Sequence, residues 1–152
     1  MKEQLLDAWR ISNGMMLLFI DNIDDDAMQL TLSPRGRNIY QQLAHAHSVR
    51  LQWLEIVAKE LLKDQKHVEK EKLDRKALRT GFEASSKAIE KFIEISWENG
   101  GKVKSFKTGL IPFISYILAH EAHHRGSALL TIKQSGIKIP EALKWGLWEW
   151  GK

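Results

Sequence analysis

The sequence predicts an all-α fold, an antiparallel four-helix bundle, from three observations. The 152 residues contain only three prolines, at positions 34, 112 and 140, so long stretches carry no helix breaker. Within these stretches, apolar residues recur at the spacing of three and four that marks one face of a helix. The alternation of apolar and β-branched residues that is typical of strands is rare. Four such stretches of roughly 20 to 25 residues favour a bundle.

The first two helices are expected at residues 2–23 and 38–63. Gly14 weakens the first helix by ~1 kcal/mol relative to alanine, and the aspartates at 24–26 mark its exit toward a loop. A turn over 33–38 precedes the second helix, whose broad apolar arc indicates burial on more than one side. The apolar stripe of this helix comprises Ile39, Leu43, Leu54, Val57 and Leu61.

The other two helices are expected at residues 74–98 and 109–134. The segment 63–76 alternates acidic and basic residues, which indicates a solvated connection rather than a nucleic-acid-binding patch. Asn99-Gly100-Gly101 provides a left-handed end for the third helix. A tail begins at Pro140, and we expect its tryptophans to pack across the bundle end or at a dimer contact.

The composition fits one domain over residues 1–152. Apolar residues make up 43% of the chain and charged residues 28%, which excludes extended disorder. There is no cysteine, so a disulfide scaffold and Cys-ligated zinc are excluded. The net charge of +4 is low for a dedicated nucleic-acid-binding protein. No segment reaches the ~18 to 20 apolar residues of a membrane span, and we expect a cytoplasmic protein with neither membrane nor nucleic-acid partners.

Two histidines on the fourth predicted helix lie where core leucines would be expected. His120 and His124 continue the apolar seam of Phe113 and Ile117. At a spacing of four, both imidazoles lie on one face of a helix, one turn apart, and can ligate one metal ion. The alternative interpretation is a pair of hydrogen-bonded core histidines. A histidine from a second long helix favours the metal site, because neutral imidazole binds zinc, nickel or iron.

The spacing leaves the third ligand open between His45 and His47. These residues point about 200° apart on a helix, so they do not easily serve one site. The apolar stripe favours His47, whereas His45 lies on a flank with Val49 and Trp53. His123 points away from its neighbours and is expected beside the site or in solvent, and His67 on the surface.

Two segments of the chain resemble signatures of the DinB/YfiT family. Leu43-Ala44-His45, followed by Arg50, Trp53 and Leu54, resembles the signature of its second helix. The run from His120 through His123, His124, Arg125 and Gly126 resembles the pattern HxxHHRG of its fourth helix. The segment 135–140 and the tryptophan-rich end are also similar, so the resemblance extends over nearly the whole chain.

The resemblance implies a four-helix bundle, often a homodimer, with a three-histidine site for zinc or nickel. On the matching positions the ligands would be His45, His120 and His124, and His47 stays the alternative to His45. Family members often carry glutamine after His-Arg-Gly, where this chain has Ser127. Substrate specificity is therefore expected to differ if that position contacts the substrate.

The resemblance also implies a reaction, a metal-dependent transfer that uses a low-molecular-weight thiol and acts in stress or detoxification. Because the chain has no cysteine, the thiol would come from a small molecule. Arg50 or Arg125 would hold a carboxylate of that thiol, or would form ion pairs within the bundle. Glu121 is a candidate proton acceptor but is expected to face solvent. The alternatives are a metal-dependent hydrolase and a non-catalytic, stress-linked dimeric binding module.

Overall fold

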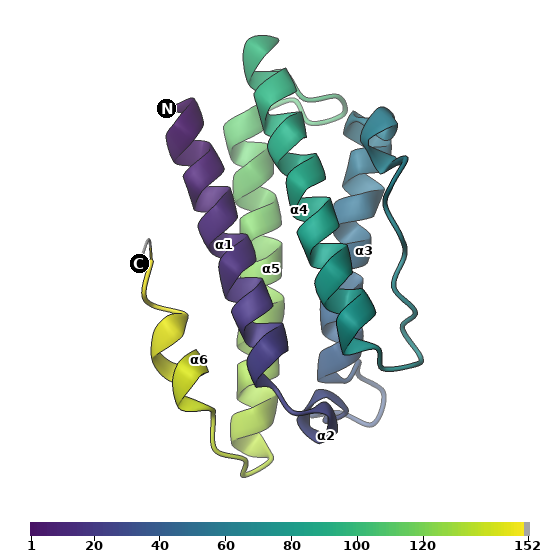
Figure 1. Ribbon diagram of the computed structural model, residues 1–152, viewed down its shortest axis with the longest axis vertical. Coiled ribbons are helices and arrows are strands. Elements are labelled where there is room, and N and C mark those ends of the chain that lie inside the picture. The colour runs from purple at the N-terminus through teal and green to yellow at the C-terminus, as the bar shows by residue number, and fades with distance from the viewer. Residues whose placement is uncertain (151–152) are drawn as a thin grey trace.

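The chain forms a bundle of four long helices. The computed structural model describes residues 1–150. The long helices are α1 (Lys2–Asn22), α3 (Ile39–Val57), α4 (Arg75–Glu98) and α5 (Leu110–Gln134). Shorter elements are α2 (Asp25–Met28), the 3₁₀ helix η1 (Lys59–Leu62) and α6 (Glu141–Gly146). The predicted all-α bundle is confirmed, and Figure 1 shows its four long helices side by side.

A long crossover between α3 and α4 sets the helix directions. It returns the chain along the outside of the bundle, so α4 starts at the same end of the molecule as α3 (Figure 1). Helices α3 and α4 are therefore parallel neighbours, as are α1 and α5. The antiparallel neighbours are α1 with α4, and α3 with α5. The second of these pairs carries the histidines.

Side-chain caps explain where two of the long helices begin. At the start of α3, Asn38 and Gln41 form a reciprocal capping box, with hydrogen bonds of 2.8 and 3.1 Å. Asp74 accepts from the Ala77 amide at 2.8 Å and caps α4. Helix α4 ends as predicted, because Gly100 has a φ of 74°, a conformation that glycine adopts without strain.

Three segments differ from the sequence-based expectations. Helix α3 ends at Val57 instead of 63, because Ala58 has a non-helical backbone (φ −159°, ψ 62°). The connection is not wholly solvated, since Val68 is buried against the core and the Tyr40 hydroxyl donates to the Glu69 carbonyl at 2.7 Å. The aspartate run enters the short helix α2, whose last two residues are buried.

Apolar side chains fill the two ends of the bundle, and polar groups separate them. One cluster centres on Phe19, Leu43 and Phe82, toward the end that carries α2. The other centres on Trp9 and Phe113, toward the opposite end. Polar side chains from all four long helices lie between the two clusters: Asn13, His47, Arg50, Ser85, Glu121 and His124. The functional candidates therefore lie at mid-height in the bundle.

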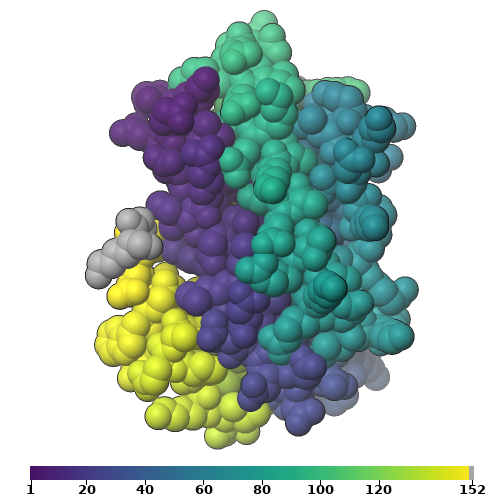
Figure 2. Space-filling view, viewed as in Figure 1, coloured from purple at the N-terminus to yellow at the C-terminus, as the bar shows by residue number. Residues whose placement is uncertain are grey.

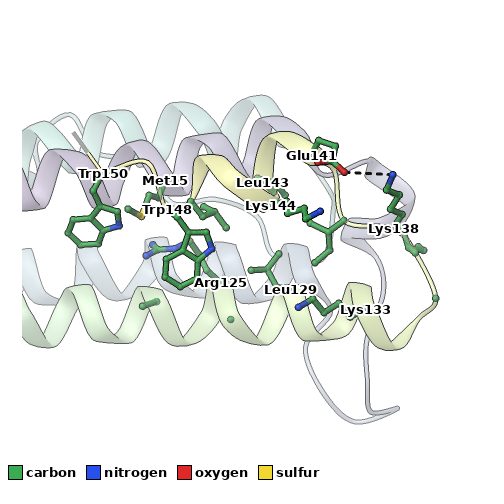
Figure 3. A pocket seen from close by; sticks show the side chains of 16 residues that line it. Met15, Arg125, Leu129, Lys133, Lys138, Glu141, Leu143, Lys144, Trp148 and Trp150 are labelled. Carbon is green, nitrogen blue, oxygen red and sulfur yellow. Dashed lines mark ion pairs between the residues drawn. The ribbon is translucent and has the colours of Figure 1, made fainter. Parts of the chain in front are cut away.

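The C-terminal segment covers one side of the bundle. Helix α6 lies along α1 and buries Leu143, and Figure 2 shows the segment as a mass beside the lower half of α1. Trp145, Trp148 and Trp150 are 60%, 80% and 59% exposed, so they do not pack on the bundle end, and a dimer contact stays a prediction. Between this segment and α5 runs a groove of about 890 Å³ (Figure 3).

No helix in residues 1–150 combines the length and apolar character needed to cross a membrane.

Candidate metal centre

Three imidazole rings from two antiparallel helices meet at mid-height in the bundle. His45 lies on α3, and His120 and His124 lie one turn apart on α5. The ring centroid of His45 is 5.5 Å from that of His120 and 5.2 Å from that of His124. The two rings on α5 are 4.6 Å apart. One nitrogen from each ring lies within 4.8 Å of the other two, so this group could hold a metal ion.

The structure brings His45, and not His47, to the two histidines of α5. His47 points toward α4, where it is fully buried with its ring 5.6 Å from the ring of Phe82. Neither of its ring nitrogens has a hydrogen-bond partner in residues 1–150. The apolar stripe favoured His47 because that stripe faces the bundle centre. The histidine cluster lies off-centre, on the flank where α3 meets α5.

Burial keeps the clustered histidines neutral. Desolvation lowers the pKa values of His45 and His120 below the usual 6.5. Desolvation, together with the neighbouring His120 and His45 rings, lowers the pKa of His124 to about 4. The positive charge of Arg37 further lowers the pKa of His45 and His124. At neutral pH all three rings therefore carry an unprotonated nitrogen that can act as a ligand.

The spacing and chemistry of the donors fit a zinc-like ion. The Nε2 atoms of His120 and His124 are 3.2 Å apart. Two nitrogens bound tetrahedrally to zinc at ~2.0 to 2.1 Å would be separated by about 3.3 to 3.4 Å. Nitrogen donors also suit nickel and iron. Three protein ligands leave at least one coordination position for a small molecule, which is the pattern of catalytic rather than structural zinc sites.

Four residues around the cluster were not singled out from the sequence. The Oε1 atom of Gln42 lies 3.5 Å from His124 Nδ1, which is long for a hydrogen bond, while Nε2 of the same ring faces His120. Tyr116 stacks on His120 with its centroid 6.4 Å away. The exposed cations Arg37 and Lys70 add positive charge near His45. Helical spacing could have identified two of these residues from the sequence, because Gln42 precedes His45 by three positions and Tyr116 precedes His120 by four.

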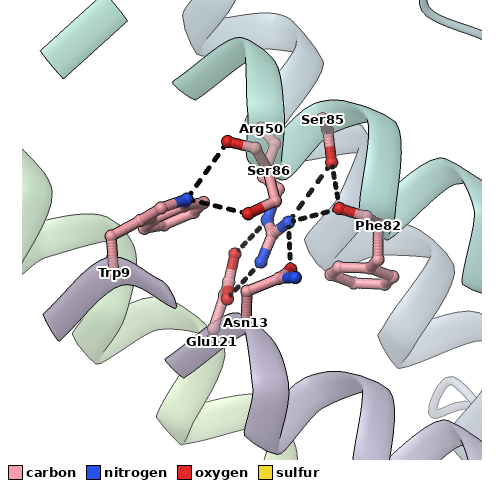
Figure 4. Close-up of polar contacts among 7 residues, drawn as sticks. All are labelled: Trp9, Asn13, Arg50, Phe82, Ser85, Ser86 and Glu121. Carbon is pink, nitrogen blue, oxygen red and sulfur yellow. Dashed lines mark hydrogen bonds and ion pairs between the residues drawn. The ribbon is translucent and has the colours of Figure 1, made fainter. Parts of the chain in front are cut away.

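A buried ion pair joins α3 and α5 next to His120 in the chain. Arg50 and Glu121 are fully buried and form a bidentate pair with N–O distances of 2.5 and 2.9 Å (Figure 4). The Nη1 atom of Arg50 donates to Asn13 Oδ1 at 2.9 Å, to the Phe82 carbonyl at 3.1 Å and to Ser85 Oγ at 3.2 Å. The guanidinium is therefore occupied by protein acceptors and is closed to a substrate carboxylate.

Glu121 is buried, contrary to the expectation that it faces solvent. It points into the bundle because it follows His120 by one position, about 100° around α5, which turns it toward Arg50. Trp9 and Phe82 enclose the guanidinium, with ring centroids 4.6 and 4.5 Å from Arg50 Cζ. An arginine among the apolar residues of the second predicted helix was the sequence signal for a buried partner.

The remaining candidate residues lie around the periphery. His123 is exposed, with its ring 5.1 Å from that of His124, and His67 is exposed on the crossover. Ser127 follows His124 by three residues on the same face of α5 and is partly buried. Arg125 points to the other side of α5 and lines the groove beside α6.

Comparisons with known proteins identify the family. The model of the DinB family matches residues 1–144. The structure is similar to the crystal structure of a DinB-like protein from Bacillus cereus ATCC 10987, with a TM-score of 0.61 and 15% sequence identity. That match covers 91% of this chain and 95% of the other, and at this identity it shows the fold. No curated protein matches the sequence. Because the family model spans nearly the whole chain, this protein belongs to the DinB family.

Proposed function

We propose that this DinB-family protein is a metal-dependent transferase that uses a low-molecular-weight thiol as co-substrate. His45, His120 and His124 hold the divalent ion, zinc or nickel. The observation that carries the proposal is the convergence of three neutral imidazoles from two helices. A divalent ion at such a site lowers the pKa of a bound thiol or water.

The carboxylate next to the ligands favours thiol transfer over hydrolysis. A hydrolase needs a general base close to the attacking water. Glu121 adjoins His120 in the chain, but both of its oxygens accept hydrogen bonds from the buried Arg50. A thiolate is itself the nucleophile and needs no such base. The chain contains no cysteine, so the thiol comes from a small molecule.

Cations at the rim of the site fit the acidic groups of such a thiol. Arg37 and Lys70 are exposed, and the positive charge of each lowers the pKa of His45. They replace Arg50 in the role of carboxylate binder, because the guanidinium of Arg50 is fully engaged inside the bundle. Tyr116, stacked on His120, supplies an apolar wall for the acceptor substrate.

The first test is metal content per chain, by elemental mass spectrometry on tag-free protein purified without chelator. We expect about one zinc or nickel ion per chain in the wild type and in His123→Ala. His123→Ala is the matched control, because it removes an exposed histidine one residue from a ligand. His124→Ala should lose the metal and keep its helical circular dichroism. An absence of metal in all three proteins, even after reconstitution, would overturn the metal site.

The second test is turnover of the metal-loaded protein with glutathione, bacillithiol and mycothiol against an electrophile panel. We expect thiol-dependent turnover that is lost in His124→Ala. Arg37→Gln should raise KM for the thiol and leave kcat nearly unchanged, because Arg37 contributes only to binding. Turnover of ester substrates without any thiol would support the hydrolase alternative. A metal-loaded protein with neither activity would support the binding module.

A further inference from the structure

The groove between α5 and the C-terminal segment is large enough for a small ligand. Its volume of about 890 Å³ falls within the range of small-molecule sites. Ala122 and Gly126, one turn apart on α5, leave room on that wall. The apolar lining includes Met15, Leu129, Ile139, Leu143 and Leu147. Such a lining favours an elongated ligand whose surface is mainly apolar.

The charges around the groove are mostly positive. Arg125, Lys133, Lys138 and Lys144 line it, and the one acidic side chain in its described lining is Glu141. The carboxylate of Glu141 lies 3.7 Å from Lys138 Nζ, so it offsets one of these cations. The three lysines are exposed, and salt screens their charges. An anionic group on the ligand would complement this lining.

Arg125 provides the position for that anionic group. Its Nη1 atom is buried and has no hydrogen-bond partner within residues 1–150. That atom is closed to the groove, so a ligand carboxylate would pair with the rest of the guanidinium, which the half-buried Arg125 presents to the groove. Figure 3 shows Arg125 among the side chains that line the groove, together with Met15, Leu129 and Trp148. A ligand whose carboxylate binds Arg125 would place its apolar chain against Leu129 and Leu143.

The groove and the histidine cluster lie on different faces of α5. His120 and His124 face α3, where His124 meets Gln42. Arg125 faces α1 and the C-terminal segment, together with Ala122 and Leu129. A ligand in the groove would therefore contact none of the three clustered histidines.

We propose that this groove binds an amphipathic carboxylate, of the medium-chain fatty acid class, with its carboxylate on Arg125. The test is isothermal titration of the full chain with decanoate, below the concentration at which decanoate forms micelles. Decanol and decylamine are the matched probes, with the same chain and a neutral or cationic head. We expect decanoate to bind at least tenfold more tightly than either. Equal affinity for decanoate and decanol, or no binding by decanoate, would overturn the proposal.

Variants identify which contacts carry the affinity. Arg125→Gln should weaken decanoate binding at least tenfold and leave decanol unaffected, whereas Lys91→Gln, an exposed lysine on α4, should change neither. Leu129→Trp should fill the groove and weaken both probes, and it keeps the proposal testable if Arg125→Gln fails to fold. Unchanged binding in Arg125→Gln or in Leu129→Trp would refute the assignment.

Decanoate could also bind the metal centre, and His124→Ala separates the two sites. The metal-free variant should bind decanoate with wild-type affinity if the carboxylate sits on Arg125. Loss of decanoate binding in His124→Ala would place the carboxylate on the metal and overturn the groove site. The outcome does not depend on thiol transfer, so the proposed function and the groove can fail separately.

Discussion

Glu121→Gln tests the buried ion pair between α3 and α5 with little change in volume. It removes the negative charge that faces the Arg50 guanidinium and retains one oxygen that can accept a hydrogen bond. Arg50 keeps its contacts with Asn13, Phe82 and Ser85, but its charge becomes uncompensated in an environment without solvent. The variant should therefore be strongly destabilised.

The expected loss is large relative to the total stability of such a protein. Removing one partner of a buried pair costs about 3 to 5 kcal/mol. The retained amide oxygen places Glu121→Gln near the lower figure, about 3 kcal/mol. A domain of this size typically has about 5 to 15 kcal/mol of stability. At roughly 2 to 4 °C per kcal/mol, the melting temperature should fall by about 6 to 12 °C.

The assay is urea unfolding followed by circular dichroism, in chelator so that metal binding does not contribute. Glu90→Gln is the matched control, because the Arg10–Glu90 pair also joins two helices, at 2.9 Å, but both of its side chains remain partly exposed to solvent. The urea midpoint of Glu90→Gln should be nearly the same as that of the wild type. The double variant Arg50→Met/Glu121→Leu should be more stable than Glu121→Gln, since it removes both charges. A Glu121→Gln midpoint as close to wild type as that of Glu90→Gln would refute the reasoning.

Three further predictions concern His47, its neighbour Gly81, and Gly14 on α1. A Cβ at Gly81 would lie 2.9 Å from His47 Nε2 and 3.2 Å from Val68 Cγ2, so Gly81→Ala should destabilise by about 1 to 3 kcal/mol. Gly14→Ala, where nothing lies within 4 Å, should stabilise by about 0.5 to 1 kcal/mol, and urea midpoints compare the two. Desolvation lowers the pKa of His47 to about 4 from 6.5, so below pH 6.5 the unfolded chain binds a proton that the folded chain excludes. The free energy of unfolding of the wild type should therefore fall as the pH is lowered from 6.5 to 4. In chelator, the free energy of unfolding of His47→Leu should fall less steeply over the same range. An equal slope in the two proteins would contradict the assignment of this pH dependence to His47.

The fold was largely predictable because its signals are local. Helix starts depend on side chains within three residues, as at Asn38 and Asp74, and helix ends on glycines such as Gly100. Three of the four predicted helices agree with the structure to within one residue at each end. The second was predicted too long, because a non-helical Ala58 ends α3 while the amphipathic pattern continues into η1.

The directions of the helices were not predictable from these local signals. The length of the connection from 63 to 74 permits either a loop at one end of the bundle or a crossover along its side. Burial of Val68 and the hydrogen bond from Tyr40 to Glu69 hold the crossover against the bundle. Because the crossover makes α3 and α4 parallel, the antiparallel partner of α3 is α5.

The sequence by itself determined the helices, the pair His120 and His124 on one face, and the absence of a thiol in the chain. These follow from helical spacing and composition, which need no knowledge of neighbours. Only the tertiary structure decided that His45 joins them, that Glu121 turns inward to Arg50, and that Arg125 faces a separate groove. The physical reason is that residues one or two positions apart on a helix face different neighbours, and packing alone determines which neighbour each face meets.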